Sequence, residues 1–149
     1  MYIGAVFVII RGMTFEALIF TFSILGISET VYLIKKRILS EKPVCPVNED
    51  CTKVLSSKYN KLFLIPNDVL GLIFYIVCSL IAAFLVIIVQ PLSLWYMLLS
   101  VLVFVGSVIS MYFTYLQYNV IKAWCFWCLM SACTIWFMGV TILLNNILL

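Results

Sequence analysis

A chain of 149 residues is long enough for one domain, and 66% of its residues are hydrophobic whereas only 10% are charged. This composition excludes an ordinary soluble protein and predicts an integral membrane protein. The net charge is only +3 and no basic segment resembles a nucleic-acid-binding module, so no nucleic-acid partner is expected.

Four apolar segments are each long enough to cross a membrane, which takes about 20 helical residues. One long polar segment, residues 35–66, separates the first two, whereas Gln90 and Pro91 make a very short turn between the second and the third. Helices joined by short turns must pack antiparallel. The sequence therefore predicts an all-α, up-down-up-down four-helix membrane bundle as a single domain, 1–149, with helices at residues 14–34, 69–89, 93–115 and 124–145.

Counting the membrane crossings gathers most of the cysteines on one face. Four crossings place both termini on one side, and they place the 35–66 loop and the start of the fourth helix on the other. That second side, which we name the active face, carries four of the six cysteines: Cys45, Cys51, Cys125 and Cys128. Cys78 and Cys133 lie mid-helix among apolar neighbours, where cysteine commonly serves as a packing residue.

The fourth helix begins with "AWCFWCLM" (123–130). Cys125 and Cys128 are three residues apart, so both sulfurs face one side of the helix and can approach disulfide distance. A thioredoxin-like Cys-x-x-Cys needs a βαβ context that an all-helical chain lacks. The bulky Phe126 and Trp127 favour an apolar, aromatic co-substrate instead. Taken alone, the pair could also be packing in lipid.

The second cysteine pair, in "CPVNEDC" (45–51), lies in a polar loop and cannot be core filler. A zinc ion held by four thiolates would require one pair to leave the end of a membrane helix, so no metal is expected. Two dithiols on one face instead indicate a relay, in which thiol–disulfide exchange moves electrons from a soluble thiol to the loop pair and then to the helix pair. The last acceptor must dissolve in lipid, which indicates a quinone.

Two stretches resemble the vitamin K epoxide reductase family: "CPVNEDCTKVLSSKYNKLFLIPNDVLGLIFY" (45–75) and "WCFWC" (124–128). They reproduce the family's loop cysteine pair, the C-x-x-V-x-S-S run after it, the I-P…G…Y pattern at the start of the second helix and the Cys-x-x-Cys of the fourth. The resemblance covers nearly the whole chain from the first helix onward. It implies a membrane enzyme that reduces quinones with thiols, similar in function to the protein that reoxidises periplasmic disulfide donors.

The resemblance also implies a role for each cysteine of the relay. Cys45 would meet the external thiol partner, and Cys51 would attack or bridge to Cys125. Cys128 would face the co-substrate, a quinone of the ubiquinone or menaquinone type.

Asn67 matches the family's quinone-binding asparagine, and its amide could donate to a quinone carbonyl. Its other possible role is to cap the second helix, because asparagine before an apolar run is common there. Ser57, with Ser56, matches the family's serine pair, which orders the loop or touches the quinone pocket; solvation at the surface is the alternative.

Two departures limit what the resemblance implies. Ala132 stands where vertebrate members have a tyrosine that lines the quinone and anticoagulant site, so epoxide reduction and anticoagulant sensitivity are not expected. No thioredoxin-like segment follows the fourth helix, so we expect the thiol partner to be a separate protein.

Quinone reduction also takes up protons, and the chain has no histidine. Glu29 within the first helix is the candidate relay, with solvation at the interface as its alternative.

We therefore expect a membrane thiol:quinone oxidoreductase that generates protein disulfides. One alternative is a non-catalytic four-span scaffold with a structural Cys45–Cys51 disulfide, and another is the reverse physiological role, in which the partner supplies electrons to recycle a quinone such as vitamin K.

The orientation in the cell membrane is a separate prediction. Family members mostly place the cysteine loop outside the cytoplasm, but basic residues are enriched in cytoplasmic flanks. Arg11 alone lies on the side of the termini, and the other basic residues lie on the active face: Lys35, Lys36, Arg37, Lys42, Lys53, Lys58, Lys61 and Lys122. The sequence thus predicts an inverted member whose active face is cytoplasmic.

Overall fold

The computed structural model describes the backbone of residues 2–45, 51–62 and 64–148, and the side chains of 14–45, 51–61 and 64–147. Four long helices dominate it: α1 (Tyr2–Ile38), α3 (Asn67–Val86), α4 (Leu92–Tyr115) and α5 (Phe126–Leu148). Each contributes a segment long and apolar enough to cross a membrane, namely Thr14–Ile38, Asn67–Val86, Leu92–Ile121 and Phe126–Ile147. The predicted all-α, four-span membrane fold is confirmed.

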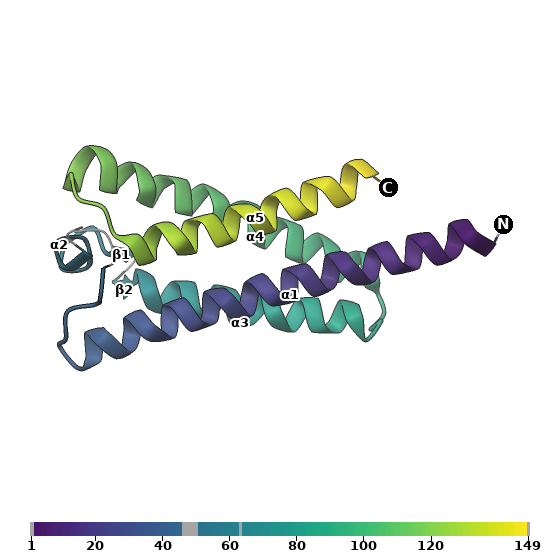
Figure 1. Cartoon of the computed structure of the whole chain (residues 1–149), viewed down its shortest axis with the longest axis horizontal. Helices are drawn as coiled ribbons and strands as arrows, with labels where there is room; N and C mark the ends of the chain where they lie inside the picture. The colour runs from purple at the N-terminus through teal and green to yellow at the C-terminus, as the bar shows by residue number, and fades with distance from the viewer. Residues whose placement is uncertain (1, 46–50, 63, 149) are drawn as a thin grey trace.

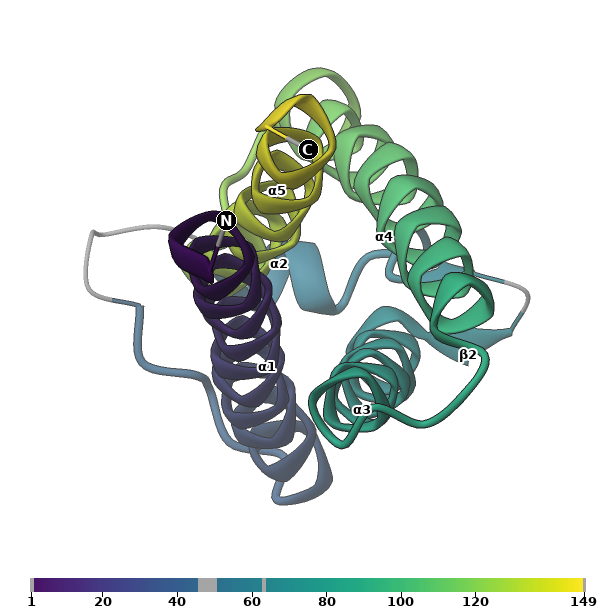
Figure 2. The same cartoon turned by 90° about the vertical axis from the view of Figure 1, so that its right-hand side faces the viewer.

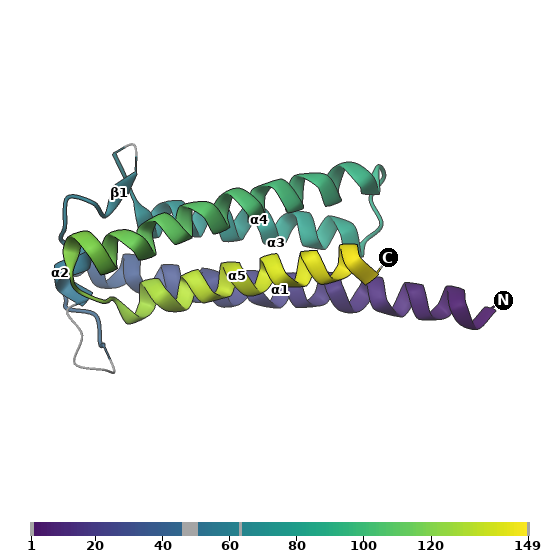
Figure 3. The same cartoon turned by 90° about the horizontal axis from the view of Figure 1, so that it is seen from above.

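The four helices form a closed bundle. Helix α1 packs against α3 and α5, and α4 packs against the same two helices, so the four surround a common core (Figure 2). Both chain ends lie at one end of the bundle, and the connection between α1 and α3 lies at the other, close to the start of α5 (Figure 1). The view from above shows the same arrangement (Figure 3). The up-down-up-down order and the shared face of the cysteine-bearing segments therefore agree with the count of crossings.

Several helix boundaries differ from those expected, including those of the second helix, which spans Asn67–Val86 rather than 69–89. Helix α1 begins at Tyr2, well before residue 14, and ends at Ile38 with three basic residues in its last turn, where cations interact favourably with the helix dipole. The connection expected at 116–123 instead starts as a π-helix, Leu116–Ile121, which prolongs α4. Helix α5 begins at Phe126 rather than at residue 124, so Cys125 directly precedes it.

The core of the bundle is built around a buried tyrosine. Tyr75 on α3 is fully buried, and its hydroxyl donates a hydrogen bond to the carbonyl oxygen of Ser131 on α5 at 2.9 Å. Helix α1 approaches this ring through Gly26, where a Cβ atom would overlap the tyrosine ring. Cys78 is also fully buried in this core, away from the other described cysteines, in agreement with a packing role.

The loop between α1 and α3 contains a short helix, α2 (Cys51–Leu55), and two short strands, β1 (Lys61–Leu62) and β2 (Ile65–Pro66). The strands pair antiparallel and make a tight hairpin. The backbone N–H of Asn67 then donates to the carbonyl oxygen of Asn60 at 2.9 Å. Because the hairpin closes on the first residue of α3, the loop fixes where the Asn67 side chain lies.

Candidate active site

Two cysteine pairs meet at the end of the bundle that carries the loop. Cys45 and Cys51 are joined in a disulfide, whereas Cys125 and Cys128 are thiols that interact with each other. Cys51 is 1% exposed and Cys125 is fully buried in the same small apolar cluster, with Cys45 and Cys128 packed against it. We call these four residues the cysteine cluster. The structure thus brings the loop pair against the helix pair. Within the loop pair, Cys45 is half-buried whereas Cys51 is buried.

The chain segment that carries Cys45 is held at the residue before it. The Tyr32 hydroxyl accepts the Val44 N–H at 3.1 Å, and the Trp127 Nε1–H donates to the Val44 carbonyl at 2.8 Å. The two aromatic rings lie 4.5 Å apart, centre to centre. Trp127, which the sequence suggested as a contact for an aromatic co-substrate, therefore anchors the loop to the start of α5.

Gln117 in the π-helix holds the other side of the cysteine cluster. Its side chain is buried, and Oε1 accepts the Cys125 N–H at 3.1 Å. Its backbone carbonyl accepts the N–H groups of Lys122 and Ala123, which shapes the turn into α5. The Cys125 carbonyl then accepts the Leu129 N–H at 3.0 Å, which starts the helix. Sequence reasoning missed Gln117, because a single amide in an apolar helix carries no signal of its partner.

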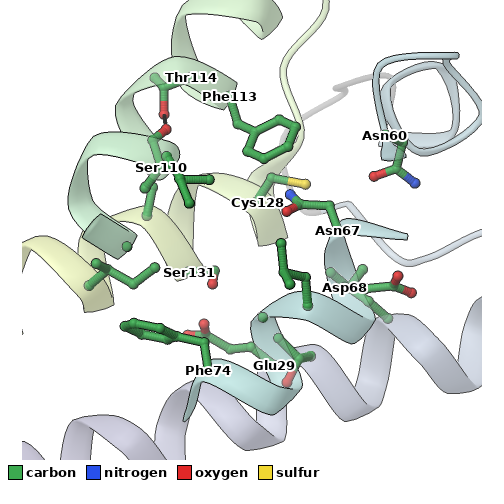
Figure 4. Close-up of a pocket in the computed structure, with 18 of the residues that line it drawn as sticks. Glu29, Asn60, Asn67, Asp68, Phe74, Ser110, Phe113, Thr114, Cys128 and Ser131 are labelled. Atoms are coloured by element: carbon green, nitrogen blue, oxygen red, sulfur yellow. Dashed lines mark hydrogen bonds between the residues drawn. The ribbon is translucent and has the colours of Figure 1, made fainter. Parts of the chain in front are cut away.

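A cavity of about 120 Å³ lies beside Cys128, between all four long helices (Figure 4). We call it the central cavity. Its apolar lining includes Phe74, Ile109, Phe113 and Ile135, and Figure 4 shows Cys128 and Asn67 side by side at one edge of it. An apolar chamber with a few polar groups is typical of sites for small organic ligands.

Asn67 is the first residue of α3, and Pro66 occupies the capping position without any side-chain cap. The capping role that the sequence allowed for Asn67 is therefore wrong. Within the described part of the chain, its side-chain amide has no hydrogen-bond partner, although it lines the central cavity beside Cys128. Such an amide is positioned to donate to a ligand carbonyl.

The residue after Asn67 forms an ion pair that sequence reasoning also missed. The Asp68 carboxylate is buried, with Oδ2 at 3.0 Å from Arg37 Nε and Oδ1 accepting the Val69 N–H at 3.0 Å. This pair ties the last turn of α1 to the first turn of α3. A carboxylate in the first turn of an apolar helix, preceded by a basic helix end, was the available signal.

The other site residues predicted from the sequence lie around the cysteine cluster and the central cavity. Glu29 and Ala132 line the central cavity. Phe126 packs against the cysteine cluster and, like Trp127, is not among the residues that line the cavity. Ser57 donates to the Val54 carbonyl at 2.8 Å and lines a smaller hollow that also reaches Cys128, whereas Ser56 is exposed.

No group of three or more histidine, cysteine, aspartate or glutamate side chains among the described residues is arranged to hold a metal ion.

The sequence matches the family model described as the vitamin K epoxide reductase family over residues 17–143. No curated protein matches the chain. Because the family match covers most of the sequence and includes both cysteine pairs, this chain belongs to the vitamin K epoxide reductase family.

Proposed function

We propose that this chain is a membrane thiol:quinone oxidoreductase that takes electrons from a separate thioredoxin-like protein and generates disulfides in it. Membership of the family supports quinone-linked disulfide redox chemistry in a membrane. The observation that carries the finer proposal is the meeting of the two cysteine pairs in one buried cluster, with Cys128 on the wall of the central cavity.

The first exchange takes place at the loop pair. A thiolate of the partner attacks the Cys45–Cys51 disulfide at Cys45, the more accessible sulfur, and a mixed disulfide forms while Cys51 leaves as a thiolate. The partner's second thiol then releases Cys45, so the partner is oxidised and the loop pair is reduced. Two electrons and two protons have moved to the loop pair.

The second exchange joins the two pairs. Cys51 attacks the Cys125–Cys128 disulfide at Cys125, and Cys128 leaves as a thiolate. Cys45 then resolves the Cys51–Cys125 bond, which restores the loop disulfide and leaves a reduced helix pair. After this step the loop pair is a disulfide again, and Cys125 and Cys128 are thiols.

The third step reduces the quinone, which is a substrate of the ubiquinone or menaquinone type. Cys128 and Cys125 give up two electrons and two protons, their disulfide forms and the quinone becomes a quinol. Asn67 donates its amide N–H to a quinone carbonyl and so stabilises the negative charge that develops there. The apolar lining of the central cavity excludes water from this charge.

The test uses the purified chain in lipid nanodiscs, a reduced thioredoxin-like protein and a soluble ubiquinone analogue, with quinol formation and partner oxidation measured together. We expect one quinol for each partner disulfide. Cys128→Ala should abolish quinol formation. In that variant the Cys125 thiolate can still attack Cys51 of the loop disulfide, with Cys45 as the leaving thiolate, so a Cys51–Cys125 mixed disulfide should be trapped. The matched Cys133→Ala variant should keep full turnover. Partner oxidation without quinol, or turnover by Cys128→Ala, would reject the relay and favour the non-catalytic scaffold.

A further inference from the structure

Glu29 is an ionisable residue within the membrane span of α1, and its side chain reaches the central cavity. Its Oε2 atom is buried and has no hydrogen-bond partner among the described residues. A charged carboxylate in such a place would lack the partners that normally compensate burial, whereas a neutral carboxyl group needs far less compensation. This carboxyl oxygen is therefore shielded from solvent, although the Glu29 residue as a whole is half-buried.

The other acidic residue that lines the central cavity, Asp68, already has partners for its charge. It forms the ion pair with Arg37 described above, and each of its carboxylate oxygens accepts a hydrogen bond or an ion-pair contact. Glu29 has no such basic partner among the described residues, and the chain has no histidine. Figure 4 shows Glu29 on the α1 side of the cavity and Cys128 with Asn67 on the opposite side. A quinone ring between them would have one carbonyl near each side.

We infer that Glu29 is the proton donor to the quinone oxygen that lies away from Asn67. This inference rests on the proposed quinone reduction. Overall, two thiols and one quinone give one disulfide and one quinol, so the thiols supply all the electrons and protons. Glu29 gives its proton to one quinone oxygen and regains a proton released by the oxidised thiols, and so ends each cycle unchanged.

The test compares Glu29→Gln with Glu16→Gln, a matched change on the same helix at a residue that does not line the cavity. Glutamine keeps the size of the side chain but cannot donate an acidic proton. We expect Glu29→Gln to lower kcat for quinol formation by about 100-fold or more, with KM changed less than threefold, since general acids contribute roughly 10²–10⁴-fold. Exchange between the partner and the loop pair should stay at the wild-type rate, and Glu29→Asp should recover part of the loss.

A second readout does not depend on turnover. Infrared spectra of the wild type and Glu16→Gln should both contain a protonated-carboxyl band that Glu29→Gln lacks. An unchanged kcat in Glu29→Gln, or equal losses of thiol exchange and thermal stability, would overturn the proton-donor role, and so would the absence of the band in the wild type. A wild type that exchanges disulfides but reduces no quinone would overturn the proposed function itself.

Discussion

The hydrogen bond from the Cys125 N–H to Gln117 Oε1 offers a sharp test of how the cysteine cluster is held. Gln117 is 4% exposed and Cys125 is fully buried, so water cannot replace a lost partner without a local rearrangement. Gln117→Leu keeps a similar side-chain volume but removes the acceptor. Leaving a buried N–H without an acceptor costs about 1–3 kcal/mol.

The same loss has a kinetic consequence, because Cys125 must lie in line with the attacking sulfur of Cys51. A misplacement of about 1 Å can slow a positioned reaction roughly 100-fold. We therefore expect Gln117→Leu to lower the free energy of unfolding by about 1–3 kcal/mol and to slow formation of the Cys51–Cys125 bond by at least about tenfold.

Two measurements check this expectation. Reversible denaturation in mixed micelles gives the free energy of unfolding, and acid-quenched trapping in the Cys128→Ala background gives the rate of Cys51–Cys125 bond formation. Gln90→Leu is the matched control, because Gln90 is exposed in the turn at the opposite end of the bundle. If Gln117→Leu changes neither quantity more than Gln90→Leu does, then this hydrogen bond does not position Cys125.

Three further predictions concern the quinone, the helix interface and the membrane. Asn67→Ala should weaken quinone reduction roughly 5- to 150-fold, the equivalent of about 1–3 kcal/mol, while thiol exchange measured by partner oxidation stays unchanged; a loss of thermal stability alone would contradict this. Gly26→Ala should lower the melting temperature, because the new methyl group displaces Tyr75 at a cost of about 1–3 kcal/mol, and an unchanged melting temperature would contradict that packing. In intact cells, Cys45 should resist a membrane-impermeant thiol reagent after mild reduction until the membrane is opened; ready labelling would establish the outward-facing arrangement instead.

The fold class, and the membrane face that each segment shares, could be predicted from hydropathy and from the number of crossings. In lipid, each spanning segment must satisfy its own backbone hydrogen bonds, so length and hydropathy locate the helices one by one. The number of crossings then places the "CPVNEDC" loop and the "WCFWC" segment at the same end. The spacing of Cys125 and Cys128 likewise predicts their proximity, because neighbours three residues apart lie on one side of a helix.

Helix ends were less well determined, because caps and turns depend on contacts with distant residues. Gln117 forms the hydrogen bonds that accompany the π-helix Leu116–Ile121 and the start of α5 at Phe126. No local sequence pattern predicts these hydrogen bonds. The contact of Trp127 could not be predicted locally either. Its aromatic side chain suggested a ligand contact, but its Nε1–H donates a hydrogen bond to the Val44 carbonyl.

The set of polar residues that share a cavity with the reactive sulfur depends on how the helices pack against one another. Glu29, Asn67 and Cys128 come from three different helices, and their meeting depends on how α1, α3 and α5 are rotated about their axes. Hydropathy gives little information about that rotation, because all sides of these helices are largely apolar. The rotation is set by close packing at Gly26 against Tyr75 and by the ion pair between Arg37 and Asp68, both of which join residues far apart in the sequence.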